Sequence, residues 1–196
     1  MRNAEVTKSK IIKESANLFN TQGYKATSIS DITRATGYTK GAIYRHFTSK
    51  QDLEQQALRS LSKLMFDEIG VLVRQATTFQ AKFEAIFGFF ENYMNAPLYQ
   101  GGCPLMNAAV ETDDNNPVLR KQAVKMLAEL KTSMTRLLDN GIGNGQVKAD
   151  IDVAFYSTIF IATLEGGIMM SKLERNTNVI RLTIEHLRNI VREISI

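Results

Sequence analysis

The stretch TSISDITRATGYTKGAIYRHFTSK, residues 27–50, contains two short helices together with the residues that begin and end them. Ser28 and Asp31 have the spacing of a capping box, which satisfies two backbone amides at a helix start. Gly37 can adopt the left-handed conformation that ends a helix, and Thr39 can cap a second one. Two helices joined by a tight glycine turn form a helix-turn-helix, whose second helix enters the major groove of DNA.

The second helix is expected over residues 40–47, with Ile43 and Phe47 facing inward. Gly41 would allow the backbone to approach DNA closely. The residues expected to meet bases or nearby backbone are Lys40, Ala42, Tyr44 and Arg45. Those expected at phosphates are Thr27, Thr39, His46 and Lys50. The alternative for the whole stretch is an ordinary helical hairpin with a solvated polar face.

Charge is distributed unevenly along the chain. Residues 1–50 carry nine Lys and Arg against three Asp and Glu, whereas residues 51–196 carry fifteen against seventeen. A basic N-terminal quarter followed by a slightly acidic remainder is typical of a DNA-binding head on a body that does not bind DNA.

The composition of the 196 residues predicts an all-α, cytoplasmic protein with no membrane partner. The chain is 44% apolar and has three prolines, and we find no alternating runs separated by Asn-Gly turns. No uninterrupted apolar run approaches the roughly 18 residues of a membrane span. The single cysteine, Cys103, excludes an internal disulfide and suits a reducing compartment.

Beyond the head, the apolar spacing predicts further helices joined by short loops. A helix over residues 7–22 should pack in the head, and one from Ser49 to about residue 74 should continue without a flexible linker. A displacement of the far end of that long helix should therefore move the head. The remaining helices, of nine in all, are expected over residues 77–95, 104–111, 118–140, 151–172 and 179–194, with polar loops at 113–116 and 141–145.

Catalytic or metal chemistry is not expected. The glycine-rich segment 141–145 follows a helix, whereas a dinucleotide-binding loop follows a strand. His46 lies in the second helix of the head and His186 lies in the last helix, and no His, Cys, Asp or Glu set has metal-ligand spacing. We predict a protein that is not an enzyme and has no catalytic residue, metal or cofactor.

Aromatic and methionine side chains among polar ones predict a mostly apolar ligand cavity. Core packing is the alternative for any one of them. Glu165 lies in a nearly apolar stretch and would need a partner, in the cavity or across a subunit boundary. The candidate ligand-binding residues are Phe66, Phe83, Phe87, Phe90, Cys103, Met106, Asn107, Glu111, Met126, Met134, Tyr156, Phe160 and Thr163.

Cys103 precedes Pro104 at the start of a short helix, and two interpretations stay open. A free cysteine is usually a small buried apolar side chain. Alternatively, the helix start would lower the thiol pKa and make Cys103 a sensor of electrophiles or oxidants.

The last two helices have the pattern of a subunit interface. The apolar helix contains Gly166 and Gly167, which permit close approach, and the terminal helix is amphipathic. Together they could form half of a four-helix bundle across a two-fold axis. The predicted contact residues are Tyr156, Phe160, Ile161, Leu164, Ile168, Ile184, Leu187 and Val191.

The run from Ile11 to Leu53 also resembles the N-terminal DNA-binding domain of TetR-family transcriptional regulators. The matching residues are Ala16, Leu18-Phe19, Gly23-Tyr24, Thr27-Ser28-Ile29, Asp31-Ile32, Gly37, Gly41-Ala42-Ile43-Tyr44-Arg45-His46-Phe47, Ser49-Lys50 and Leu53. The resemblance covers about the first quarter of the chain, and beyond it only length and architecture agree.

The resemblance implies a homodimeric repressor of a pseudo-palindromic double-stranded DNA operator, released by a small apolar or amphipathic effector. Residues 1–48 would be the helix-turn-helix domain and residues 49–196 the effector-binding and dimerisation domain. An activator, a ligand-free regulator, and an all-α carrier or enzyme with a basic face remain alternatives. The sequence does not identify the effector, the operator or the target genes.

Overall fold

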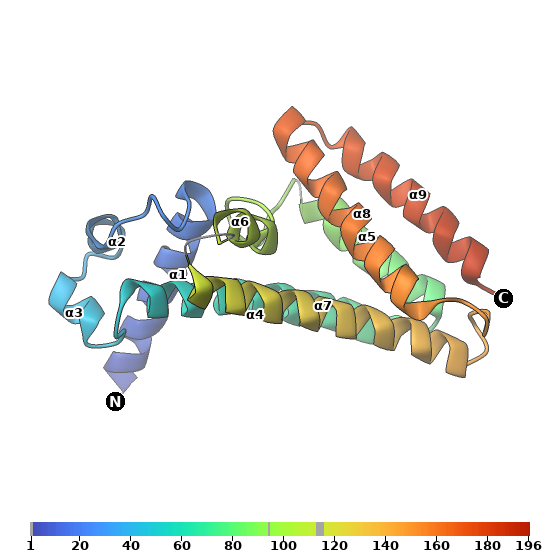
Figure 1. Ribbon diagram of the computed structural model, residues 1–196, viewed down its shortest axis with the longest axis horizontal. Helices are drawn as coiled ribbons and strands as arrows, with labels where there is room; N and C mark the ends of the chain where they lie inside the picture. The colour runs from blue at the N-terminus through green and yellow to red at the C-terminus, as the bar shows by residue number, and fades with distance from the viewer. Residues whose placement is uncertain (1, 94, 113–115) are drawn as a thin grey trace. The chain divides into compact units, whose positions relative to one another are not determined.

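The computed structural model describes residues 2–93, 95–112 and 116–196, which form nine α-helices and no β-strand (Figure 1). The prediction of an all-α fold is confirmed. Met94 and residues 113–115 of the predicted loop lie outside the described residues. The chain divides into two compact units, and α4 and α7 contribute to both.

Unit 1 comprises residues 1–64 and 99–126. Its small core includes Ile11, Phe19, Ile32, Ile43 and Leu53, all fully buried. Unit 1 is larger than the predicted head because α6 packs against α1. Its helices are α1 (Arg2–Gln22), α2 (Ile29–Thr36), α3 (Lys40–Tyr44), the first part of α4 (Lys50–Gln75), α6 (Pro104–Glu111) and the start of α7 (Pro117–Gly143).

The predicted capping box at the start of α2 is present. The Asp31 amide donates to Ser28 Oγ at 3.2 Å, and the Ser28 amide donates to Asp31 Oδ2 at 2.9 Å. Hydrogen bonds from the Ser28 hydroxyl and amide hold the pKa of the Asp31 carboxyl below its usual value. Gly37 ends the helix with φ 74° and donates its amide to the Thr33 carbonyl.

Helix α3, the second helix of the predicted helix-turn-helix, is shorter than predicted and ends at Tyr44 rather than at residue 47. Thr39 caps it as expected, because its hydroxyl accepts from the Ala42 amide at 3.2 Å. The His46 amide then donates to the Ile43 carbonyl, three residues back, so the last turn tightens. The tighter turn brings Phe47 into the core of the head, where it is 2% exposed.

The start of α4 is capped by two neighbouring residues. The Asp52 amide donates to Ser49 Oγ at 3.1 Å. The Asp52 carboxylate, however, accepts from the Thr48 amide at 3.0 Å. Partial burial raises the pKa of the Asp52 carboxyl, but hydrogen bonds from Gln56 and Thr48 outweigh it and keep the pKa below its usual value.

Unit 2 comprises residues 65–98 and 127–196. Phe83 and Phe160 meet in its core with ring centroids 4.7 Å apart. Arg188 joins two helices by donating to Glu84 at 3.0 Å and to Glu91 at 3.2 Å. Besides the remainders of α4 and α7, its helices are α5 (Phe79–Tyr93), α8 (Val153–Glu174) and α9 (Asn178–Ile194).

Two glycines in unit 2 allow close packing between helices or between a helix and a loop. A Cβ on Gly167 would lie 2.7 Å from Thr183 Oγ1, so this glycine lets α9 lie against α8 of the same chain (Figure 1). A Cβ on Gly141 would lie 2.6 Å from Val147 and 2.8 Å from Phe79. This packing accompanies the extension of α7 to Gly143, three residues into the segment predicted as a loop.

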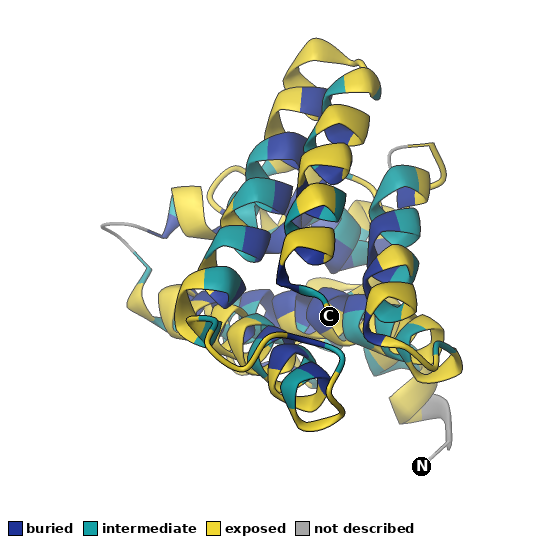
Figure 2. Ribbon diagram, turned by 90° about the vertical axis from the view of Figure 1, so that its right-hand side faces the viewer, coloured by how far each residue is buried: buried dark blue, intermediate teal, exposed yellow. Residues whose placement is uncertain are grey.

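Helix α8 is more exposed than its apolar composition predicts. Among the described residues it is the one helix long and apolar enough to cross a membrane, with a mean hydropathy of 1.5. A single such helix is weak evidence for a membrane span, because core helices meet the same criterion. Only 28% of its most apolar window is buried, and α9, which leads to the C-terminus, also has an exposed outer side (Figure 2).

Candidate nucleic-acid interface and ligand cavity

The outer face of α3 and its cap carries accessible polar groups. Thr39, Lys40, Gly41 and Arg45 are exposed, and Tyr44 is 42% exposed. The Lys40 ammonium lies 5.9 Å from the centroid of the Tyr44 ring. Within the described residues neither the Lys40 nor the Arg45 side chain has a carboxylate partner. This face therefore presents two cations and a phenol, which are donors suited to phosphates and base edges.

Ala42 and His46 are half-buried, so each presents only part of its side chain on this face. The His46 ring lies 6.3 Å from that of Phe47, against the core of the head.

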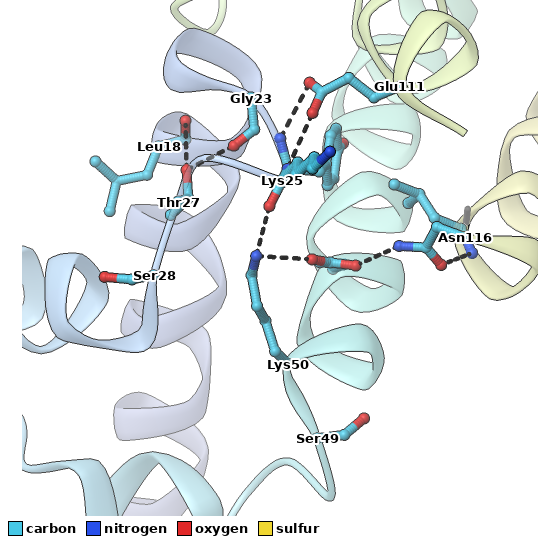
Figure 3. Close-up of polar contacts among 12 residues, drawn as sticks. Leu18, Gly23, Lys25, Thr27, Ser28, Ser49, Lys50, Glu111 and Asn116 are labelled. Carbon is cyan, nitrogen blue, oxygen red and sulfur yellow. Dashed lines mark hydrogen bonds and ion pairs between the residues drawn. The ribbon is translucent and has the colours of Figure 1, made fainter. Parts of the chain in front are cut away.

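Thr27 does not occupy the position predicted for it. Its side chain is fully buried, and its hydroxyl donates to the Gly23 carbonyl at 2.7 Å (Figure 3). A hydroxyl in this position cannot reach a phosphate. Thr27 instead fixes the turn between α1 and α2.

Lys50 also makes its polar contacts within the protein. Its ammonium donates to the Tyr24 carbonyl at 2.6 Å and lies 3.3 Å from Glu54 Oε1 (Figure 3). The Phe19 ring lies beneath it, with the centroid 5.9 Å from Nζ. These contacts do not favour the predicted phosphate contact by Lys50, because its charge is already paired with a buried carboxylate.

Glu54 extends this contact to the start of α7. It is 3% exposed, and its carboxylate accepts from Asn116 Nδ2 at 2.8 Å. Asn116 Oδ1 in turn accepts from the Leu119 amide at 3.0 Å, within the first turn of α7. A continuous set of polar contacts thus joins the turn after α1 to the starts of α4 and α7 (Figure 3).

Glu111, predicted to bind ligand, binds the backbone of the head instead. Its two carboxylate oxygens accept from the Tyr24 and Lys25 amides, each at 3.0 Å (Figure 3). Gly23 ends α1 with φ 95°, and a Cβ there would lie 2.8 Å from Glu111 Oε1. The last residue of α6 therefore satisfies two backbone amides of the turn that follows α1.

Asn107 makes a second link between α6 and α1. Its Nδ2 donates to Asn20 Oδ1 at 2.9 Å and to the Asn20 carbonyl at 3.1 Å. Tyr24, beside these contacts, is 2% exposed. Burial, followed by the charges of Glu111 and Glu54, raises the pKa of the Tyr24 phenol, so it remains neutral at physiological pH.

Unit 2 contains a cavity of about 610 Å³ between α4, α5, α7 and α8. This volume lies within the range of small-molecule sites. Most of the wall is apolar, with side chains that include Phe66, Ile69, Ile86, Phe90, Leu137 and Ile168. The polar side chains of the wall are Arg74, Lys82, Ser133, Arg136, Asn140 and Glu165.

Three predicted ligand-binding residues, Phe66, Phe90 and Met134, line this cavity, as does Glu165. The other ten predicted residues do not line it. Phe83, Phe87 and Phe160 are fully buried in the core of unit 2, and Tyr156 and Thr163 are half-buried on α8 outside the wall. The remaining five belong to unit 1: Cys103, Met106, Asn107, Glu111 and Met126.

The residues that sequence reasoning missed are mostly charged or polar ones near helix ends. Arg74 and Lys82 lie in the last turn of α4 and the first turn of α5, and Arg136 lies in the second half of α7. A cation in the last turn of a helix, such as Arg74, is normally interpreted as a solvated group that favours the helix dipole, and Lys82 and Arg136 as solvated charges. No one-dimensional pattern indicates that these three converge on one cavity.

Six of the eight predicted dimer contacts are corrected by their burial within one chain, and the half-buried Tyr156 and Ile161 stay predictions. Ile161 lines the cavity, and Tyr156 is half-buried. A side chain covered by its own chain cannot supply a contact to a partner. The six residues that are at most 5% exposed are Phe160, Leu164, Ile168, Ile184, Leu187 and Val191.

Two models of known protein families match the N-terminal and the C-terminal parts of the chain. Residues 11–57 match the family model described as bacterial regulatory proteins, tetR family. Residues 80–187, more than half of the chain, match the model described as tetracyclin repressor-like, C-terminal domain. In the part of the chain that the structure describes, no group of His, Cys, Asp and Glu could hold a metal ion.

Similar proteins cover nearly the whole chain. The structure resembles a TetR transcriptional regulator from Chloroflexus aurantiacus, with 31% identity, a TM-score of 0.93, and coverage of 100% of this chain and 98% of that one. A TetR-family regulator from Cytophaga hutchinsonii is 27% identical, with the same TM-score and coverage. The HTH-type transcriptional repressor DhaR from Mycobacterium sp. (strain GP1) is 24% identical over 85% of this chain and 82% of its own length. The chain therefore belongs to the TetR family of DNA-binding transcriptional regulators.

Proposed function

We propose that this protein is a cytoplasmic repressor that binds a pseudo-palindromic DNA operator as a homodimer and releases it when a small apolar or amphipathic effector binds. The observation that carries the proposal is the pairing of an accessible cationic face on α3 with a cavity of about 610 Å³ in unit 2. Relatives such as DhaR bear the name of repressor, which supports repression over activation.

We assign the DNA contacts to those of the predicted DNA-binding residues that are exposed. Lys40, Tyr44 and Arg45 would meet base edges and nearby backbone, and Thr39 and Gly41 would lie close to the sugar–phosphate backbone. Ala42 and His46 would contribute through the parts of their side chains that remain accessible. The five-residue length of α3 is sufficient, because major-groove contacts come from the first turns of a recognition helix.

The dimer is proposed to form through the outer face of α8, in place of the buried residues predicted from sequence. Phe155, Met169 and Leu173 are 54%, 43% and 77% exposed. With Ala162 and Gly166 they are spaced three, four or seven residues apart, so they form one stripe along the helix. Pairing this stripe with its two-fold copy would cover apolar surface that the single chain leaves in water.

The proposed coupling depends on the continuity of α4, which runs from Lys50 to Gln75. Its last turns line the cavity, and its first turn carries Lys50, which contacts the head. An effector that shifts the last turns of α4 would therefore alter the spacing of the two recognition helices. That spacing must be about 34–36 Å for adjacent major grooves.

The test is an electrophoretic mobility shift with duplex DNA from the region upstream of the protein's own gene. A repressor of this class should give a discrete complex that survives excess nonspecific DNA and disappears with one member of a metabolite library. A complex lost equally to any competitor DNA would contradict operator recognition. Retention of the complex with every library member, together with transcription stimulated by the protein, would favour an activator.

A further inference from the structure

The cavity of unit 2 has an uneven distribution of charge. Unit 2 as a whole carries ten Lys and Arg against twelve Asp and Glu. The cavity wall reverses this balance, because it carries Arg74, Lys82 and Arg136 against the single carboxylate of Glu165. The wall of the cavity thus carries an excess of cations within a slightly acidic unit.

The positions of the three cations along their helices place them toward one end of the cavity. Arg74 lies in the last turn of α4, and the following residues lead into the first turn of α5, which carries Lys82. The start of α5 meets the end of α7, since Phe79 packs where a Cβ of Gly141 would lie. Arg136 lies in the same C-terminal half of α7 as Gly141. Phe90, in contrast, is eight residues beyond Lys82, about 12 Å along α5.

The guanidinium of Arg74 is directed onto the cavity wall. Its Nη1 lies 3.1 Å from the position that a Cβ on Gly70 would take, and Gly70 itself lines the cavity. Within the described residues, none of the three cationic side chains has an ion-pair or hydrogen-bond partner. Glu165, by comparison, already has an interaction within the protein.

We propose that the effector is an anionic amphipath, with an apolar body among α5, α7 and α8 and a carboxylate or similar anion at Arg74, Lys82 and Arg136. Ser133 and Asn140 of the same wall supply further hydrogen-bond donors for the anion. This inference rests on the proposed function, because it specifies the ligand of the proposed effector cavity. Charge-assisted hydrogen bonds to a carboxylate are stronger than those to a neutral hydroxyl, so charge should decide among ligands of equal length.

The test compares decanoate, decan-1-ol and decylammonium by isothermal titration calorimetry on the full-length protein. The three probes share a ten-carbon chain and differ in head-group charge. Decanoate should bind roughly tenfold more tightly than decanol, with decylammonium weakest. The advantage of decanoate should shrink between 50 and 500 mM NaCl, because Arg74 and Arg136 are exposed to screening.

The variants Arg74→Gln, Lys82→Gln and Arg136→Gln should each reduce decanoate affinity several-fold and leave decanol affinity unchanged. Lys131→Gln is the matched control, since Lys131 is an exposed cation of α7 outside the cavity wall. If the cations are only solvated surface charges, the variants will leave the ratio of decanoate to decanol affinity unchanged, and the inference is wrong.

The other outcomes separate the inference from the proposed function. Equal binding of decanoate and decanol would overturn the anionic assignment and leave the effector cavity standing. Tightest binding of decylammonium would assign the head group to Glu165 instead. Failure of all three probes to bind, in a protein that still binds its operator, would overturn the effector cavity together with the inference.

Discussion

Tyr44 and Lys50 lie six residues apart and have opposite environments. Tyr44 projects from α3 and is 42% exposed, whereas the Lys50 ammonium is bonded to the Tyr24 carbonyl and paired with Glu54. The first side chain is available to DNA and the second is part of the packing of unit 1. Substitutions at the two positions should therefore have different consequences.

Tyr44→Ala should weaken specific operator binding by about 1–3 kcal/mol, because a side chain that reads or braces a base is lost. Its melting temperature should stay close to that of the unmodified protein. Fluorescence anisotropy on operator and scrambled duplexes measures the first effect, and thermal unfolding followed by circular dichroism measures the second. Tyr44→Phe separates the hydroxyl from the ring. An unchanged operator titration for Tyr44→Ala would remove α3 from the interface.

Lys50→Gln should lower the free energy of unfolding by about 1–3 kcal/mol, since it leaves the buried Glu54 carboxylate without its cation. The salt dependence of DNA binding should keep its slope, because no phosphate contact is lost. Urea denaturation and anisotropy at several salt concentrations measure the two quantities. The double variant Lys50→Met/Glu54→Leu should recover part of the stability. A slope reduced by about one with unchanged stability would restore the phosphate role.

At the scale of elements, α6 holds the turn after α1 through Glu111 and Asn107. The Glu111 carboxylate accepts from two successive amides, a geometry that requires two acceptor oxygens on one side chain. Gly23 makes room for it, because a side chain there would collide with the carboxylate. The position of the head's first turn thus depends on a residue 87 positions away in sequence.

Glu111→Gln keeps one acceptor oxygen and should leave one of the two amides unpaired. We expect a loss of about 1–2 kcal/mol in the free energy of unfolding. Hydrogen exchange at the Tyr24 and Lys25 amides should accelerate more than exchange elsewhere in α1. Glu129→Gln, at an exposed position of α7, is the matched control. Unchanged exchange at both amides would show that the carboxylate does not hold this turn in solution.

At the scale of the whole molecule, the exposed stripe of α8 is an apolar surface that the single chain leaves in water. Charges at Ile161 or Ile168 would test the wrong feature, because Ile161 lines the cavity and Ile168 is 2% exposed in the same wall. Charges on the outer face of α8 leave the chain's own core intact.

Met169→Glu and Leu173→Glu should each convert the homodimer to a monomer in sedimentation velocity at micromolar concentration, because an unpaired charge would have to be desolvated at the interface. Operator affinity should fall with dimerisation, since one head makes only half of the contacts. Val124→Glu, which places the same charge at a 55% exposed position on α7, should stay dimeric. An unmodified protein that sediments as a monomer would refute the proposed dimer.

The sequence by itself determined the elements that depend on neighbouring residues. Ser28, Asp31, Gly37 and Thr39 act over three or four positions, so their spacing was sufficient to predict the helix-turn-helix. The helical period likewise predicted the all-α fold, because apolar stripes repeat along each helix. The motif around residues 41–47 carried the resemblance to the TetR family that the comparisons establish.

The tertiary structure alone decided which polar side chains are free. Thr27 and Lys50 have side chains suited to phosphates. The burial of Thr27 and the bond of Lys50 to the Tyr24 carbonyl, 26 positions away, were not evident from sequence spacing. Tertiary packing likewise decided which residues line the cavity and which are free to form a subunit interface. Helical period identifies a residue that faces inward, but only packing decides whether it meets another side chain, as Phe83 meets Phe160, or an open cavity, as Phe90 does.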